Sequence, residues 1–337
     1  MEVLGRHTAV SYLADSAFRD VALLADNAGA LPPLVIAVGD ARRVIAAASV
    51  LRLEPAVFLH EIAAGRGGLA ARGRVHLLLG LFRHAGRAIP LLIAETQMGM
   101  PATEIILREV LGHCRRSYRA GGRTLDLDAV YVVRAGTAGG INAAGHPPLA
   151  VGDLVDAEFT LGWSGTLLQT MGGLELAAPQ AVERFRNCWR ELGLEFTGDG
   201  RYPVARSWPG LVAAIEAGAR ERGCVCHRGG NLSKDSLYAE AQAEEFVALR
   251  QRYGVLSTEM EQLAIAAVAA QMSSAGRPVR TALAAAIVGL LPGESLAPRV
   301  DDRGSLDPGE AAALEVAAHA LWLAASGTAG PGDLPAS

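Results

Sequence analysis

The sequence predicts a single three-layer α/β domain built around a central, mostly parallel mixed sheet. Short apolar runs alternate along the chain with segments of helical periodicity, and glycine-containing turns separate them. This alternation is typical of sheets that helices cover on both faces. The chain has 337 residues, half of them hydrophobic, which is enough to bury a core of this kind.

The first two predicted units share one pattern of strand, turn and helix. Residues 34–38 (Leu-Val-Ile-Ala-Val) form an apolar run, and a Gly-Asp step leads from it into a helical pattern over 43–51. Residues 91–94 form the next run, and a Gly-Met-Pro turn precedes a helical pattern over 103–111. Short apolar runs bounded by glycine or proline predict buried strands.

The later elements continue this alternation. Residues 129–133 predict a third strand, and the glycine-rich segment 134–140 after it predicts a turn. Further strands are expected at 149–151, 224–225, 254–256 and 283–288. The last helix has a clear start, because Asp307 suits the cap, Pro308 the first turn and Glu310 the positive end of the helix dipole.

Three segments look like additions to the core and a tail follows it; we take the domain to run from 31 to 326. Residues 1–30 form an N-terminal extension before the first strand, and 327–337 form a flexible tail rich in glycine, alanine and proline. Within the domain, an insert spans about 163–210 and a polar loop spans 292–307.

Composition limits the possible partners. The net charge is −4, so the chain has no basic field to hold a nucleic acid. Charged and polar residues interrupt its apolar runs before they reach the length of a membrane span, and its start lacks the apolar segment of a signal peptide. We therefore expect a soluble cytoplasmic protein that binds neither nucleic acid nor membrane.

The turns after the predicted strands hold residues suited to an anion. Ligands of open α/β sheets bind at the carboxyl ends of the strands. Gly39 and Arg43 follow the first strand, and Arg134 and Thr137 follow a central one. Glycine lets backbone N–H groups approach a phosphate, while arginine adds charge and paired donors. The alternative is that the glycines only form turns and that Arg43 is a solvated helix residue.

Two acids stand at the start of a strongly apolar helix predicted over 263–272. Thr258 and Glu261 have the spacing of a capping box, and acids favour helix N-termini, so Glu261 has an ordinary structural explanation. The functional alternative is a carboxylate that accepts hydrogen bonds from two sugar hydroxyls, with Met260 packed on the apolar face of the sugar.

Five motifs together resemble the nucleoside phosphorylase family that contains bacterial purine nucleoside and uridine phosphorylases. They occur in the family's order and approximate spacing. The motifs are Gly39-Asp-x-x-Arg43, Gly99-Met-Pro-Ala-Thr103, Arg134-x-Gly-Thr-x-Gly139, Ser233-Lys-Asp-Ser-Leu-Tyr238 and Glu259-Met-Glu261. The resemblance covers about residues 34–325 and implies the family's fold.

The resemblance also implies roles for single residues. Gly39, Arg43, Arg134 and Thr137 are expected to bind phosphate, with Arg74 contributed by a neighbouring subunit. Ribose is expected to contact Glu259, Met260, Glu261 and, from the adjacent subunit, His7. Arg134 and Glu261 are the expected catalytic residues, and Ala138, Gly139, Leu237, Gln242 and Leu290 are expected around the base.

The base pocket departs from both branches of the family. Purine phosphorylases place an acid after the strand that matches 284–288, but here the strand leads into Gly289-Leu290. Uridine phosphorylases follow the Asp-Ser-Leu-Tyr segment with a Gln and an Arg, and here only Gln242 is present, one position out of register. The aromatic residue that usually stacks on the base is replaced by Leu237.

These residues predict a nucleoside phosphorylase that uses inorganic phosphate as co-substrate and needs no metal or organic cofactor. Nucleoside and phosphate would give free base and ribose 1-phosphate, with uridine favoured over a purine nucleoside. The alternatives are a purine nucleoside phosphorylase, a nucleosidase that uses water, and a non-catalytic nucleoside-binding member. Since Arg74 and His7 are expected in a neighbour's site, we expect a homodimer as the minimal active unit, within a hexamer.

Overall fold

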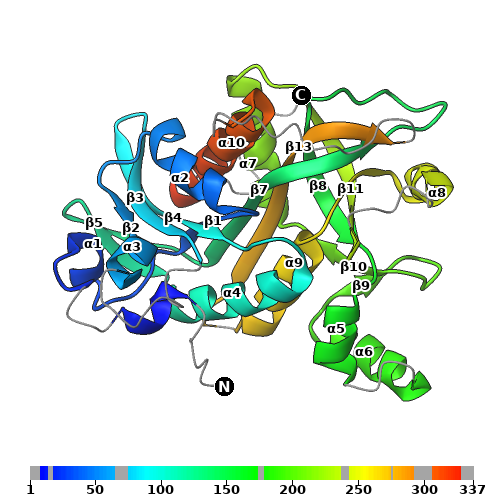
Figure 1. Ribbon diagram of the computed structural model, residues 1–337, viewed down its shortest axis with the longest axis horizontal. Helices are drawn as coiled ribbons and strands as arrows, with labels where there is room; N and C mark the ends of the chain where they lie inside the picture. Colours follow the sequence, from blue (N-terminus) through cyan, green and yellow to red (C-terminus); the bar gives the residue numbers. More distant parts are fainter. Residues whose placement is uncertain are drawn as a thin grey trace.

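The computed structural model describes residues 8–13, 18–64, 75–173, 178–236, 243–274, 276–291 and 306–327. Its centre is a long mixed sheet flanked by helices on both faces (Figure 1). The fold class predicted from the sequence is therefore confirmed. In spatial order the strands are β2 (Ala56–Phe58), β3 (Leu77–His84), β4 (Arg87–Glu95), β1 (Leu34–Val38), β7 (Val130–Ile141), β12 (Val255–Glu259), β11 (Cys226–Ser233), β8 (Leu154–Leu161), β10 (Pro203–Arg206) and β9 (Glu195–Phe196).

The long strand β13 (Val279–Leu291) closes part of this sheet on itself. It pairs in parallel with β7 along its length and antiparallel with β8. Because β7, β12, β11 and β8 are also joined in that order, these strands and β13 form a closed circuit. Ala138, Val155, Ala157, Ala285 and Ile287 form a buried cluster from three of its strands.

Parallel pairing dominates around the strands that matter for the site. Strand β1 runs parallel to both β4 and β7. Strand β1 therefore ends at Val38 beside Glu95, the last residue of β4, and Arg134 in the middle of β7 lies at the same edge of the sheet. Antiparallel pairing occurs in the β3–β4 hairpin and between β12 and β7. The carboxyl ends of β1 and β4 therefore share one edge, and their amino ends share the other.

Helices cover the two faces of the sheet (Figure 1). On one face lie α2 (Ala41–Val50), α7 (Pro209–Glu221) and α10 (Pro308–Ala325), and on the other lie α3 (Leu59–Ala64), α4 (Met100–His113) and α9 (Gln262–Met272). Side chains of β1 alternate between the two layers, with Ile36 in the first cluster and Val35 in the second. This period of two is what a strand buried on both faces requires.

The remaining elements extend or cover this core. They are η1 (Ala9–Tyr12), α1 (Ala22–Ala25), the β5–β6 hairpin (Ser117–Ala120 and Arg123–Asp126), α5 (Gly165–Gly172), α6 (Pro179–Glu191) and α8 (Ala243–Tyr253). Val10, Phe18 and Leu24 of the predicted N-terminal extension are buried against the sheet. The expected insert contains α5, α6, β9 and β10, and the division of the chain into extension, domain and tail stays a prediction. Within the described ranges, no helix has both the length and the apolarity to cross a bilayer.

The predicted turn at 134–140 is wrong, because β7 continues as a strand to Ile141. Its glycines serve close packing instead of chain reversal. A Cβ on Gly136 would lie 2.8 Å from the guanidinium of Arg134, and one on Gly140 would lie 2.9 Å from Ile287. Gly136 therefore leaves room for the Arg134 side chain to lie against the backbone of β7, and Gly140 leaves room for Ile287 of the paired strand β13.

Two other strand predictions are corrected in position. Residues 149–151 form no strand, and β8 starts at Leu154 beyond a turn where Gly152 has φ +96°. The run at 224–225 precedes β11, which begins at Cys226 and continues through glycines. These two strands contain no long apolar run, because β8 includes acidic residues and β11 includes glycines, so apolar runs alone did not predict their bounds.

Gly162, which follows β8, provides a test of the close approach between β8 and β11. Its φ is +151°, and an added Cβ would overlap the carbonyl oxygen of Ser233. Because a backbone carbonyl cannot rotate away, Gly162→Ala should lower the free energy of unfolding by roughly 3 kcal/mol or more. Gly198→Ala is the control, since nothing lies within 4 Å of the added Cβ there. Denaturant unfolding that gives the two variants equal stability would contradict this account.

Candidate active site

Two arginines converge on the backbone that follows β1. An added Cβ on Gly39 would lie 3.1 Å from Nη1 of Arg43 and 3.3 Å from Nη2 of Arg134. Both guanidinium groups thus lie within 3.3 Å of one point beside Gly39. Arg43 comes from the first turn of α2 and Arg134 from the middle of β7, so the parallel pairing of β1 with β7 brings them together.

Arg43 is held by two carboxylates and a hydroxyl. Asp40 caps α2 by accepting the Arg43 backbone N–H at 2.9 Å, and its other oxygen lies 3.0 Å from Arg43 Nη1. Glu310 at the start of α10 accepts from Arg43 Nε at 3.1 Å and from Nη2 at 2.5 Å. Nη2 also donates to Thr137 Oγ1 at 3.2 Å, so Thr137 joins the predicted phosphate group.

Glu310 is a site residue that sequence reasoning missed. Its place in the sequence indicates only a helix start, and it does form a capping box with Asp307. The same carboxylate contacts Arg42 Nη2 at 2.8 Å as well as Arg43, and its side chain is 5% exposed. A cap explained the residue completely, so no sequence signal pointed to a second partner 267 residues away.

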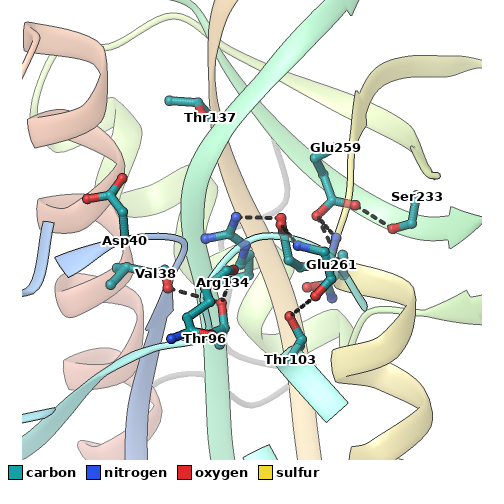
Figure 2. A network of polar contacts seen from close by, with 12 residues as sticks. Val38, Asp40, Thr96, Thr103, Arg134, Thr137, Ser233, Glu259 and Glu261 are labelled. Atoms are coloured by element: carbon teal, nitrogen blue, oxygen red, sulfur yellow. Dashed lines mark hydrogen bonds and ion pairs between the residues drawn. The ribbon is translucent and has the colours of Figure 1, made fainter. Parts of the chain in front are cut away.

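Arg134 forms a buried ion pair with Glu261, and Figure 2 shows the two side chains facing each other. Arg134 Nη2 lies 2.7 Å from Glu261 Oε2, and both side chains are 5% exposed or less. Arg134 Nη1 donates to the carbonyl of Ala135 at 3.2 Å, whereas its Nε has no hydrogen-bond partner among the described residues. The buried cation thus keeps its Nε–H uncommitted.

The other oxygen of Glu261 is bound by the turn before α4. Gly99, with φ +87°, donates its backbone N–H to Glu261 Oε1 at 2.8 Å. Thr103 donates its hydroxyl to the Gly99 carbonyl at 2.9 Å, which fixes this turn (Figure 2). Glu261 therefore lies between β7 and α4, and its carboxylate is fixed at both oxygens.

The capping alternative for Glu261 is wrong, because its neighbour Glu259 caps α9. Glu259 Oε2 accepts the backbone N–H groups of Glu261 at 2.8 Å and of Gln262 at 2.9 Å. Its Oε1 accepts from Asn231 at 2.9 Å and from the hydroxyl of Ser233. The hydroxyl of Thr258, the other half of the predicted box, has no partner within the described part of the chain.

The two glutamates therefore have different environments. Burial raises the pKa of Glu259, the Glu261 carboxylate raises it further, and Arg134 opposes both effects. Four donors of the chain itself already bind the Glu259 carboxylate, so its predicted contact with ribose stays a prediction. Glu261 is the acid that is paired with the arginine of the predicted phosphate site.

Comparison with known proteins identifies the family of the chain. The family model described as "Phosphorylase superfamily" matches residues 42–288. The chain belongs to the phosphorylase superfamily. Among solved structures, it resembles uridine phosphorylase from Vibrio fischeri ES114, complexed with 6-hydroxy-1-naphthoic acid, with a TM-score of 0.54 and 20% identity over 87% of this chain and 92% of that chain. A comparison with curated proteins gave no significant match.

The residues expected around the base lie on β7, on β13 and outside the described residues. Ala138 and Gly139 lie on β7, and Leu290 of β13 packs against the Ala138 cluster and above Gly140. Leu237 and Gln242 lie outside the described residues, as do the expected neighbour-site residues Arg74 and His7. Met260 is half-buried, with its methyl 3.9 Å from the position of a Cβ on Gly99, so it lies beside the turn that binds Glu261.

Glu310 provides a test of how Arg43 is positioned. Glu310→Ala should release Arg43 from its place beside Gly39, and we expect this loss of position to outweigh the removal of a neighbouring negative charge, so inorganic phosphate binding should weaken about tenfold or more. Glu310→Gln keeps an acceptor for Nε and Nη2, so its phosphate affinity should stay within about threefold of wild type. Calorimetric titration with phosphate measures both. Equal affinities in the Ala variant and wild type would show that Arg43 needs no such support.

Proposed function

We propose that this protein is a nucleoside phosphorylase that cleaves the N-glycosidic bond with inorganic phosphate. The observation that carries the proposal is the convergence of Arg43 and Arg134 on Gly39 while Arg134 is ion-paired with Glu261. Arg134 thereby joins the anion site to Glu261, a carboxylate able to bind sugar hydroxyls. Membership of the phosphorylase superfamily supports the same reaction class.

In this mechanism the chain acts by positioning and electrostatics. Phosphate bound by Gly39, Arg43, Arg134 and Thr137 supplies the nucleophilic oxygen at the anomeric carbon. The C1′–N bond breaks and a C1′–O bond to phosphate forms, through a transition state with oxocarbenium character like that of glycoside hydrolysis. Glu261 holds the ribose hydroxyls, and the negative phosphate stabilises the developing cation.

The charges around the site support a contribution from another subunit. Among the described residues, carboxylates here outnumber cations: Asp40, Glu259, Glu261 and Glu310 surround Arg42, Arg43 and Arg134. Adding a phosphate dianion to this set is unfavourable unless a further cation arrives. We propose that Arg74 of a neighbouring copy supplies it, and that a homodimer within a hexamer is the active form.

For the leaving group we propose a pyrimidine, with uridine as the substrate to test first. A purine leaves best when an acid protonates it, and residues 289–291 of β13 are Gly-Leu-Leu. Uracil needs no such acid, because its carbonyl oxygens carry the departing charge.

A nucleosidase is the second candidate, and the pairing of Arg43 favours it. Asp40 and Glu310 both neutralise this arginine, which lowers its attraction for phosphate. Under this alternative, water takes the place of phosphate and the products are free base and ribose.

Phosphate dependence separates the two candidates. Uridine, inosine and adenosine are incubated with and without phosphate, and the sugar product is identified by mass. We expect uridine cleavage to require phosphate and to give ribose 1-phosphate, with kcat/KM for uridine at least about tenfold above that for inosine. Ribose formation at an equal rate in phosphate-free buffer would make the protein a nucleosidase. A preference for inosine would show that another group supplies the acid.

Glu261→Gln tests the ribose role. The amide retains an acceptor for one of the two donors that bind the carboxylate, but it loses the charge, so kcat/KM should fall by about 10²-fold or more. The melting temperature reports separately whether loss of the ion pair with Arg134 destabilises the fold. Glu104→Gln is a matched control, because it removes another carboxylate that is paired with an arginine, in this case Arg108 of the same helix. Normal kinetics in Glu261→Gln would remove Glu261 from the mechanism.

A further inference from the structure

Two histidines and a glutamate from three separate elements meet on the face that carries α7 and α10. His84 ends β3, Glu221 ends α7 and His319 lies in the second half of α10. One ligand atom from each lies within 4.8 Å of the other two. None of these residues takes part in the site described above.

The distances are close to those that a metal ion imposes. His319 Nε2 is 2.9 Å from Glu221 Oε2, and His84 Nε2 is 3.8 Å from Glu221 Oε1. Zinc binds imidazole nitrogen and carboxylate oxygen at about 2.1 Å, so two atoms on one ion lie at most about 4.2 Å apart. Both histidine–glutamate distances meet this limit, and the three ligand atoms together, which lie within 4.8 Å of one another, exceed it only slightly.

Packing holds His319 in place before any ion arrives. Its side chain is 6% exposed, its ring stacks on Trp322 at 6.0 Å with an interplanar angle of 6°, and the ring of His84 meets it edge-on at 4.7 Å. Its Nδ1 is buried without a hydrogen-bond partner in the described ranges. Burial lowers the pKa of His319, against the pull of Glu221, and a neutral imidazole is the form that binds metal.

We propose that His84, Glu221 and His319 form a binding site for Zn²⁺ or a chemically similar divalent transition metal. Two imidazoles select such ions over Mg²⁺ and Ca²⁺, which prefer sites made only of oxygen ligands. Glu221 is 52% exposed and His84 26% exposed at the side chain, so solvent reaches the site and water can complete the coordination.

The position of the site gives it a structural role and not a role in the reaction. His84 pairs with Arg87 at the beginning of β4, whereas the predicted phosphate site lies where β1 and β4 end. The site is therefore at the opposite edge of the sheet. An ion there would tie β3, α7 and α10 together, and α10 is the helix whose first turn holds Arg43 through Glu310.

Zinc titration of the chelator-treated full chain tests the proposal. We expect one Zn²⁺ per chain by calorimetry, a higher melting temperature with Zn²⁺, and no such change with Mg²⁺. His84→Gln and Glu221→Gln change exposed or half-exposed side chains and should each weaken Zn²⁺ binding by at least about tenfold. Anomalous diffraction at the zinc edge should place the ion between the three side chains.

The chain offers a matched control in His227 and Asp153. His227 Nε2 lies 2.8 Å from Asp153 Oδ2, which is the same kind of pair without the second imidazole. His227→Gln should therefore leave Zn²⁺ affinity unchanged. Wild-type protein that binds no Zn²⁺, or Zn²⁺ affinity that survives both His84→Gln and Glu221→Gln, would overturn the proposal. So would an anomalous peak located only elsewhere.

Discussion

The ion pair between Arg134 and Glu261 is the contact on which the candidate site depends. Both side chains are nearly inaccessible, so each charge would be costly without the other. The pair also joins three elements, since Arg134 lies on β7, Glu261 begins α9, and Gly99 before α4 binds the second carboxylate oxygen. Any anion or sugar that enters meets groups whose positions are already fixed, which is the condition for electrostatic stabilisation without reorganisation.

Glu259 and Glu261, which are separated by one residue, have the same side chain but different roles. Glu259 accepts four donors from its own chain and fixes the start of α9. The Glu261 carboxylate forms no cap hydrogen bond and is bound instead by Arg134 and Gly99. Because Glu259 caps the helix, the carboxylate of Glu261 is available to pair with Arg134.

The sequence was sufficient for the fold class and for the grouping of Arg43, Arg134 and Thr137, because apolar runs and the positions that follow them are local signals. The phosphate role of these residues stays a prediction. Arg43, Arg134 and Thr137 came together as expected from parallel strands whose ends share an edge. It was insufficient for β7, whose glycines resemble a turn until the pairing with β13 is known, and for β8, which acidic residues disguise. Glu310 was missed for a related reason: its contact with Arg43 joins distant segments, and a local cap had already explained it.

Helix α10 shows why such distant contacts matter for the site. It has 18 residues, Pro308–Ala325, and is therefore about 27 Å long. Glu310 in its first turn lies beside Arg43, and the carbonyl of Ala325 at its end accepts from Arg87 at the other edge of the sheet. Asp307 and Glu310 fix its first turn by a capping box, and the same Glu310 carboxylate holds Arg42 and Arg43. A shift of the helix along its axis would therefore move the acceptor of Arg43. The position of a predicted phosphate ligand thus depends on the packing of the whole helix, because a single carboxylate serves both as the helix cap and as the partner of the arginine.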